Sequence, residues 1–265
     1  MYACPKCKVP MTGLTCERCA VTYSSVDGIP CFLTAAPGDS GEELRRIYDD
    51  IYSHHEDVWI DQGRSERFQS YFGELARALS TNRLLEIGCG EGTLLAALTG
   101  THKYGIDPSI HALVRARKRS GANCAVARAE DLPFVSESFD LVVAVGVMEH
   151  FEKPDEATAE IHRLLAPAGH YVTLIHTDMT TRDRLALKAR EFLYPRPRPV
   201  AFIKWMRKKI WHPIEQPLRR SYTIDAARLC LERAGFNIKQ IITREANPHA
   251  PLAGGHVVIL VAQKP

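Results

Sequence analysis

The stretch LLEIGCGEGTLL, at residues 84–95, places three glycines at alternate positions between two hydrophobic runs. Glycine has no Cβ and tolerates positive φ, so a strand that ends in such a turn lets backbone N–H groups approach a ligand closely. The dinucleotide fingerprint G-x-G-x-x-G would need glycine in place of Thr93, so NAD fits poorly. A P-loop ends in Gly-Lys-Ser/Thr, which this turn lacks.

Two acidic residues narrow the choice of ligand. Glu86 stands two residues before Gly88, the first glycine of the turn. A carboxylate in this position attracts a cationic amine and repels a pyrophosphate. The next predicted strand ends at Asp107, about where an acid reaches a ribose diol. The ligand is therefore expected to carry both a cationic group and a ribose.

Two C-x-x-C pairs, CPKC and CERC, make a second group of reactive residues: Cys4, Cys7, Cys16 and Cys19. Each pair can direct two thiolates to one centre, and four thiolates form a closed tetrahedral zinc site with no open position for catalysis. A segment this short needs such a link to fold. A redox C-x-x-C is the competing interpretation, but no thioredoxin-like βαβ pattern surrounds the pairs. The sequence predicts structural zinc.

The composition bounds the class of protein. The chain has 265 residues, 45% of them hydrophobic and 25% charged, with a net charge of +3, as in a soluble globular protein. This charge is too small to indicate a polyanionic partner by itself. The N-terminus MYACPKCK has no signal-like apolar region, and the longest apolar stretch is shorter than a membrane span. We therefore expect a cytoplasmic protein with reduced cysteines.

The elements that must position these residues alternate along the chain. Predicted strands at 83–88, 103–107, 123–128, 139–146 and 170–176 are interleaved with helices at 92–98, 109–119 and 154–166. A helix at 223–236 and strands at 237–245 and 255–263 follow. Such alternation predicts an α/β fold with a mostly parallel sheet and helices on both faces. Helical spacing also predicts helices in 42–59 and 65–79.

Five motifs in this order, EIGCGEG, GIDPS, ARAEDLPF, SFDLVVAVGVMEHF and HRLLAPAGHYV, resemble the class I S-adenosylmethionine-dependent methyltransferases. The likeness is to the branch that contains quinone-biosynthesis and many small-molecule methyltransferases. It is tight over about 83–176 and topological over 223–265. The resemblance implies a Rossmann-like, seven-stranded, mostly parallel sheet, with a small N-terminal zinc ribbon and a helical lid insertion added to it.

The resemblance also implies roles for single residues. Glu86 would hold the methionine amine, Gly88 and Gly90 would lie beneath the cofactor, and Asp107 would bind both ribose hydroxyls. Ala129 would offer its N–H to the adenine, and Val145 or Gly146 a carbonyl to the amine. Arg128 stands where relatives often have an aspartate for the adenine amino group, so Glu130 or Asp131 would supply that acceptor. The full set of expected cofactor-binding residues is Glu86, Gly88, Cys89, Gly90, Gly92, Asp107, Pro108, Ala129, Glu130, Val145 and Gly146.

Two histidines are candidates for a general base. The sulfonium methyl of the donor is already electrophilic, so the protein mainly has to align a nucleophile in a dry pocket. A hydroxyl acceptor would benefit from a base, and the resemblance puts His150, in VMEHF, near the methyl group. His176, at the end of the fifth strand, is the second candidate. A structural hydrogen bond is the alternative role for each histidine.

The predicted domains are a zinc-ribbon-like module at 1–36, a linker with cap helices at 37–82, the core at 83–176, an insertion at 177–222 and the end of the core at 223–265. The module resembles the small zinc-ribbon partner of tRNA, rRNA and protein methyltransferases. It is expected to stabilise the core, with substrate recruitment as the alternative. The insertion carries twelve Lys and Arg against four acids, interleaved with aromatics. It is predicted to be a lid over the substrate, with contact to an anionic membrane surface or to RNA as alternatives.

The expected function is S-adenosylmethionine-dependent methyl transfer to a small-molecule or lipid-linked acceptor, with oxygen as the expected accepting atom. The alternative is an rRNA or tRNA base methyltransferase that binds RNA through the zinc module and the basic insertion. A third hypothesis is a zinc-scaffolded binding protein with a vestigial cofactor fold. Intact Glu86, Gly88, Gly90 and Asp107 argue against it.

Overall fold

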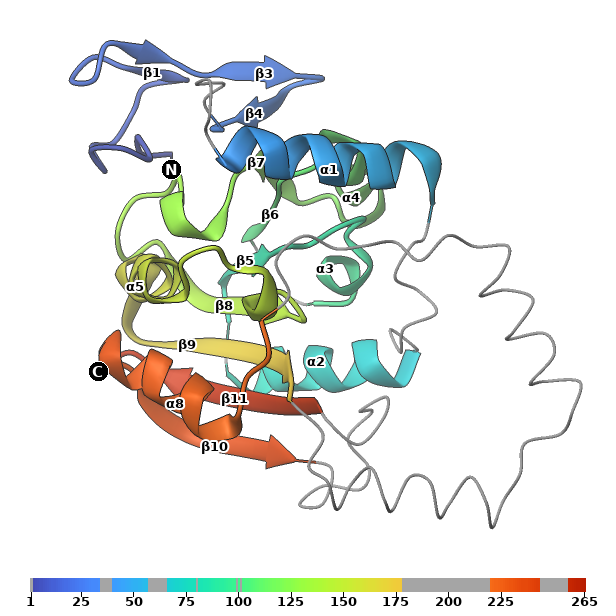
Figure 1. The fold of residues 1–265 in the computed structure, drawn as a ribbon, viewed down its shortest axis with the longest axis vertical. Helices are drawn as coiled ribbons and strands as arrows, with labels where there is room; N and C mark the ends of the chain where they lie inside the picture. Colours follow the sequence, from blue (N-terminus) through green and yellow to red (C-terminus); the bar gives the residue numbers. More distant parts are fainter. Residues whose placement is uncertain are drawn as a thin grey trace, which may run out of the picture.

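The computed structural model describes residues 2–33, 40–56, 66–79, 81–98, 100, 102–177, 220–243 and 257–265. One sheet of nine strands runs through these residues, in the order β10-β11-β9-β8-β5-β6-β7-β4-β3 (Figure 1). Its strands are β3 (Ser24–Val26), β4 (Ile29–Cys31), β5 (Arg83–Ile87), β6 (His102–Asp107), β7 (Asn123–Val126), β8 (Phe139–Val145), β9 (Leu165–His176), β10 (Asn237–Thr243) and β11 (Val257–Gln263). β1 (Thr15–Cys16) and β2 (Val21–Thr22) form a separate small sheet.

The centre of the large sheet is parallel, as the alternating pattern predicts. β5 pairs in parallel with β6 and β8, β6 pairs in parallel with β7, and β8 pairs in parallel with β9. β11 and β10 follow β9 in antiparallel pairs. Strands covered on both faces are nearly continuous hydrophobic runs, as FDLVVAV in β8 shows. Because the central strands are parallel, their carboxyl ends meet at one edge of the sheet.

Helices cover both faces of this sheet. On one face, buried residues of α5 (Pro154–Leu164) and α8 (Ile224–Arg233) share a core with the strands. On the other face, the core includes α2 (Glu66–Ala78), α3 (Thr93–Ala97) and α4 (Ile110–Ser120). α1 (Ser40–His54) packs outside α4 through a smaller cluster that contains Tyr48, Tyr52 and Ala112. Two short 3-10 helices, η2 (Ala129–Asp131) and η3 (Met148–His150), follow β7 and β8.

Local sequence explains where the helices begin and end. Ser109 caps α4 by accepting a hydrogen bond from the N–H of Ala112, and Gly121 ends the helix with φ of 67°. Pro154 occupies the first turn of α5, with acids in that turn and basic residues in the last turn. α5 ends at Leu164, two residues earlier than predicted, because β9 already begins at Leu165.

The expected count of seven strands is two too low. β4 pairs in parallel with β7 through Cys31 and Val126, and β3 pairs with β4 in antiparallel fashion. Two strands of the predicted N-terminal module therefore extend the main sheet (Figure 1). The sequence pattern missed this because each strand has only three residues. The predicted lid at 177–222 lies outside the described residues except for Thr177 and residues 220–222.

Across the described residues, no helix is both long enough and apolar enough to cross a bilayer.

Candidate functional site

The glycine turn lies at the carboxyl edge of the sheet, between β5 and α3. Gly88, Gly90 and Gly92 all have positive φ, at 63°, 50° and 73°. A Cβ added to Gly88 would lie 2.6 Å from Cγ2 of Val147, and one added to Gly92 would lie 2.8 Å from the Cα of Ala116. Both the backbone conformation and the close packing therefore require glycine at these two positions.

Asp107 joins the end of β6 to this turn. Its Oδ2 accepts a hydrogen bond from the N–H of Gly90 at 3.0 Å, and its Oδ1 accepts one from the N–H of Ser109 at 3.0 Å. The carboxylate is buried, so these bonds fix its position one strand away from the turn. Pro108 follows at the end of the strand. The structure thus places Asp107, the candidate for ribose binding, beside the glycine turn, as expected for two adjacent parallel strands.

Glu86 lies in β5, where it pairs with Gly105 of β6 and Val143 of β8. Its side chain is fully buried. Cys89, the second residue of the turn, is also fully buried, and its N–H donates to the carbonyl of Ile106 at 3.0 Å. Glu86 thus places a buried carboxyl group two residues before the turn, and in its ionised form this group would attract a cationic group of a ligand.

The loop after β7 holds the residues expected around an adenine. Ala129 and Glu130 are buried in η2. Oε1 of Glu130 accepts hydrogen bonds from the N–H groups of Glu152 at 2.8 Å and Lys153 at 3.2 Å. Burial raises the pKa of Glu130, and these hydrogen bonds oppose the shift. Glu130 thus joins η2 to the start of α5.

Arg128 occupies the position where an adenine-binding aspartate was expected. Its Nη2 lies 2.7 Å from Oδ2 of Asp131, and its Nη1 lies 3.5 Å from Oε2 of Glu152. The guanidinium therefore engages one of the two acids that the sequence offered as substitutes. The role of Glu130 or Asp131 in adenine binding stays a prediction.

The end of β8 completes the same edge. Val145 is buried, and Gly146 has φ of 64° and donates its N–H to the carbonyl of Leu174 in β9 at 2.8 Å. A Cβ on Gly146 would lie 3.5 Å from Cε1 of His176. The imidazole of His176 therefore packs beside the backbone of Gly146, on the edge that also carries the glycine turn.

The two candidate histidines differ in their surroundings. His150 ends η3, with its N–H donating to the carbonyl of Val147 at 2.8 Å. Nδ1 of His176 lies 2.8 Å from Oε1 of Glu149, which also accepts the backbone N–H of His176 at 2.5 Å. Sequence inspection missed Glu149. The only signal for it was an acid next to His150 in VMEHF.

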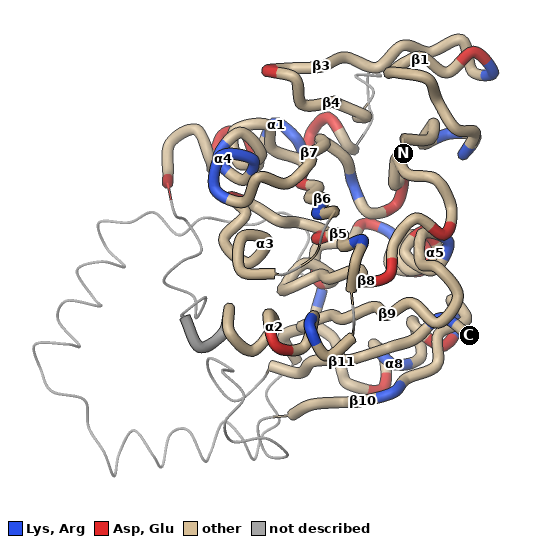
Figure 2. Tube along the Cα trace, turned by 180° about the vertical axis from the view of Figure 1, so that it is seen from behind, with Lys and Arg blue, Asp and Glu red and all other residues tan. Residues whose placement is uncertain are grey.

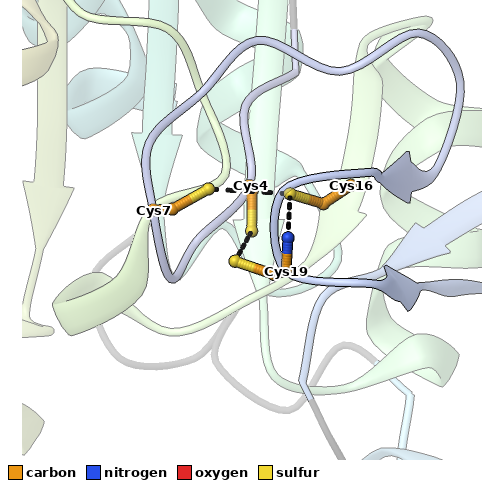
Figure 3. A group of neighbouring side chains, drawn as sticks. All are labelled: Cys4, Cys7, Cys16 and Cys19. Carbon is orange, nitrogen blue, oxygen red and sulfur yellow. Dashed lines mark hydrogen bonds between the residues drawn. The ribbon is translucent and has the colours of Figure 1, made fainter.

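The four N-terminal cysteines form one cluster, as the spacing predicts (Figure 3). Their sulfur atoms lie within 4.8 Å of one another, with 3.9 Å between Cys4 and Cys19 and 3.6 Å between Cys7 and Cys16. Tetrahedral Zn–S bonds of about 2.3 Å would separate the sulfurs by about 3.8 Å. All four are free thiols. Their geometry fits a closed zinc site, and zinc itself stays a prediction.

This cluster lies beside the loop that follows β7. Nζ of Lys8 forms an ion pair with Oε2 of Glu160 in α5 at 2.6 Å, and the same oxygen accepts the N–H of Leu132 at 3.1 Å. The ring of Tyr2 stacks on that of Phe134 at 5.6 Å. One carboxylate therefore links the first cysteine pair to the residue that follows η2.

Part of this chain resembles known proteins. Residues 85–173 match the family model of a methyltransferase domain. An O-methyltransferase of Aspergillus nomiae is 30% identical, over 43% of this chain and 59% of its own length. A phthiotriol/phenolphthiotriol dimycocerosates methyltransferase of Mycobacterium ulcerans is 32% identical, over 41% of each chain. A probable tRNA methyltransferase 9B of Mus musculus is 32% identical, over 34% of this chain and 21% of its own length.

These matches are partial, since the chain spans between 21% and 59% of the length of the three relatives. Solved structures share the fold over a larger part of the chain. The 1,6-didemethyltoxoflavin-N1-methyltransferase of Burkholderia thailandensis has a TM-score of 0.58 at 17% identity, covering 92% of this chain and 94% of its own. A methyltransferase of Thermotoga maritima, described as a possible histamine N-methyltransferase, has a TM-score of 0.56 at 22% identity, covering 84% and 100%. Residues 85–173 therefore match a methyltransferase domain, and the chain shares its fold with solved methyltransferases.

Proposed function

We propose that the protein transfers the methyl group of S-adenosylmethionine to a hydroxyl of a small-molecule or lipid-linked acceptor. One observation supports S-adenosylmethionine as the methyl donor. The N–H of Gly90, in the glycine turn, donates a hydrogen bond to the Asp107 carboxylate and so joins the turn to this residue. The donor supplies an electrophilic methyl on a sulfonium when bound. Glu86 and the carbonyl of Val145 or Gly146 would hold its amine, and Asp107 its ribose.

Further residues around the glycine turn and the loop after β7 would contact the donor. The turn residues Gly88, Cys89, Gly90 and Gly92 would line the donor, with Pro108 beside the ribose. Ala129 and Glu130 would border the adenine, because η2 follows the strand next to β6. The buried, hydrogen-bonded state of Asp107 supports this assignment, because a pre-fixed carboxylate loses little entropy when it binds a diol.

Two points support a small or lipid-linked acceptor over RNA. Two of the relatives are an O-methyltransferase and a phthiotriol/phenolphthiotriol dimycocerosates methyltransferase. Over the described residues, which leave out most of the basic insertion at 177–222, acidic and basic positions are interspersed and form no continuous basic stripe of the kind that RNA binding uses (Figure 2). His150 and His176 remain the proposed candidates for the base.

A direct test uses isothermal titration of S-adenosylhomocysteine, followed by assays with labelled donor on phenols, catechols and isoprenoid quinols. Binding of the product and label transfer to a hydroxyl are expected. Absence of product binding would contradict the donor assignment, whereas binding with transfer only to nitrogen or carbon would contradict the O-methyl assignment.

RNA base methylation is the second candidate, favoured by a relative named as a probable tRNA methyltransferase and by the basic insertion at 177–222. In that case the affinity for tRNA or rRNA fragments should fall steeply between 50 and 200 mM salt, as phosphate contacts require. Binding that does not respond to salt, or no binding, rejects this candidate.

A further inference from the structure

We propose that Glu149 is a positioning residue for His176, and that the two form a general-base dyad for the acceptor hydroxyl. This inference rests on the proposed O-methyl transfer. It favours His176 over His150 as the general base, because Glu149 Oε1 has hydrogen bonds to the ring and to the main chain of His176.

The two hydrogen bonds fix the orientation of His176. The backbone N–H of His176 donates to Oε1 of Glu149 at 2.5 Å, and Nδ1 lies 2.8 Å from the same oxygen. A carboxylate can only accept, so Nδ1 must carry the proton of a neutral imidazole. Nε2 then keeps its lone pair and can accept a proton.

The two side chains differ in their exposed fraction, and this difference suits a general base. The Glu149 side chain is 2% exposed, whereas that of His176 is 48% exposed. Burial alone would raise the pKa of Glu149, but the hydrogen bonds from the His176 side chain and backbone outweigh it and lower the pKa. Glu149 therefore stays ionised behind an imidazole that solvent or substrate can reach.

Neighbouring contacts join the dyad to the donor side of the site. The ring of His176 lies beside Gly146, where a Cβ would come within 3.5 Å of Cε1. Val147, the next residue, packs against Gly88 so closely that a Cβ there would lie 2.6 Å away. Gly88 begins the glycine turn, so the dyad and the turn meet through two residues.

Contacts on the other side join the dyad to the predicted acceptor side. The N–H of Arg220 donates to the carbonyl of Glu149 at 2.8 Å, and Nη2 of Arg220 donates to the carbonyl of Glu152 at 2.8 Å. Thr177 and Tyr222 form a parallel bridge directly after His176. The described ends of the insertion, Thr177 and residues 220–222, therefore lie next to the dyad.

The proton balance of the step is simple. The acceptor O–H gives its proton to Nε2 of His176 as its oxygen forms a bond to the methyl carbon. The C–S bond breaks, and its electron pair stays on sulfur, giving S-adenosylhomocysteine. The imidazolium is stabilised by the Glu149 carboxylate and releases its proton to water through its exposed side.

The first experiment measures the tautomer of His176 and does not depend on the acceptor. Two-bond ¹H–¹⁵N correlation spectra of the full chain, above pH 7, are expected to show the Nδ1-protonated tautomer. Glu149→Gln should lose this preference, because an amide can also donate to Nδ1. Exposed Glu156→Gln in α5 is the matched control and should leave the spectrum unchanged. An Nε2-protonated ring in the unmodified chain would overturn the dyad.

The second experiment measures reactivity and turnover. Acylation of His176 by diethyl pyrocarbonate, followed by mass spectrometry, should slow in Glu149→Gln and should be protected by S-adenosylhomocysteine. On any hydroxyl acceptor that the unmodified chain methylates, Glu149→Gln and His176→Gln should each lower kcat about 10²-fold or more with little change in KM. Glu149→Asp should restore part of the loss.

Unchanged kcat in Glu149→Gln, with a folded protein by circular dichroism, would overturn the catalytic role of the dyad. Should Glu149→Gln fail to fold, His176→Gln replaces a half-exposed ring and decides the same question. If no hydroxyl acceptor is methylated, the O-methyl assignment fails, and the spectra alone judge whether Glu149 sets the tautomer of His176.

Discussion

At the scale of the residue, the candidate site depends on a few side chains with little freedom to change. Asp107 connects its own loop to the glycine turn through hydrogen bonds to Gly90 and Ser109. Gly88 is confined by positive φ and by Val147. A change at either position should therefore alter cofactor binding or folding in a way that the contacts specify.

Replacing Asp107 with Asn is expected to weaken binding of S-adenosylhomocysteine about 10- to 100-fold, since a hydrogen bond to a charged group contributes about 1.5–3 kcal/mol. Isothermal titration measures the change. Asp140→Asn is the control, because Asp140 bonds to Asn82 and Arg83 at the start of β5, at the opposite end of that strand. Equal affinity in the Asp107 variant would show that the ribose is held elsewhere.

Gly88→Ala should lower the free energy of unfolding by about 1–3 kcal/mol, because the new Cβ meets Val147 and the positive φ is strained. Urea unfolding measures this cost. Adding Val147→Ala should recover part of it by removing the clash, while the backbone strain remains. Equal stability of the single variant and the unmodified protein would contradict the packing of Val147 against the turn.

At the scale of the element, ion pairs and hydrogen bonds between side chains and backbone fix how neighbouring strands meet. Nη2 of Arg83 lies 2.6 Å from Oδ1 of Asp140, while Oδ2 accepts the backbone N–H of Arg83 at 2.8 Å. These bonds join the first residue of β5 to the second residue of β8. Burial opposes ionisation, but the hydrogen bonds from Arg83 outweigh it and lower the pKa of Asp140.

The pH dependence of the Arg83–Asp140 interaction follows from the direction in which the pKa of Asp140 is shifted. A carboxyl with a depressed pKa in the folded state adds stability above its unfolded pKa, about 3.9, and that stability is lost as the pH falls below it. Asp140→Asn should therefore cost about 1–2 kcal/mol at pH 7, and this difference should shrink at pH 3. Urea unfolding at both pH values measures it. A difference that grows at low pH would contradict an ionised Asp140.

At the scale of the whole molecule, the N-terminal segment belongs to the same body as the methyltransferase domain. Cys4, Cys16 and Phe32 share a hydrophobic core with the central strands, and β4 continues the sheet beside β7. Lys8 and Glu160 add an ion pair between the cysteine pair and α5. Loss of order at the cysteines should therefore spread to the sheet edge.

Metal analysis is expected to find one zinc per chain. Removing it with a chelator, or by Cys16→Ser, should lower the melting temperature of the whole protein, because the free energy of metal binding contributes to folding. Cys31→Ser is a matched control, since Cys31 is buried in β4 outside the cluster, and it should retain the zinc. Full thermal stability after chelation would contradict a structural metal.

The sequence by itself determined the parts of this protein that depend on local pattern. The alternation of hydrophobic runs and amphipathic helices predicted a parallel α/β sheet, and parallel strands bring Gly88 and Asp107 to one edge without further information. Two C-x-x-C pairs predicted the cysteine cluster, because each pair already orients two thiols. These features are set by residues close together in the chain.

Only the tertiary structure decided the features that join distant segments. The Asp27-Gly28 turn, in which both residues have positive φ, marks the hairpin of β3 and β4 locally, but only the tertiary structure places β4 beside β7. Arg128 reaches Glu152 only once η2 meets the segment that leads into α5. Glu149 meets His176, 27 residues later, because β8 and β9 are adjacent parallel strands whose carboxyl ends coincide.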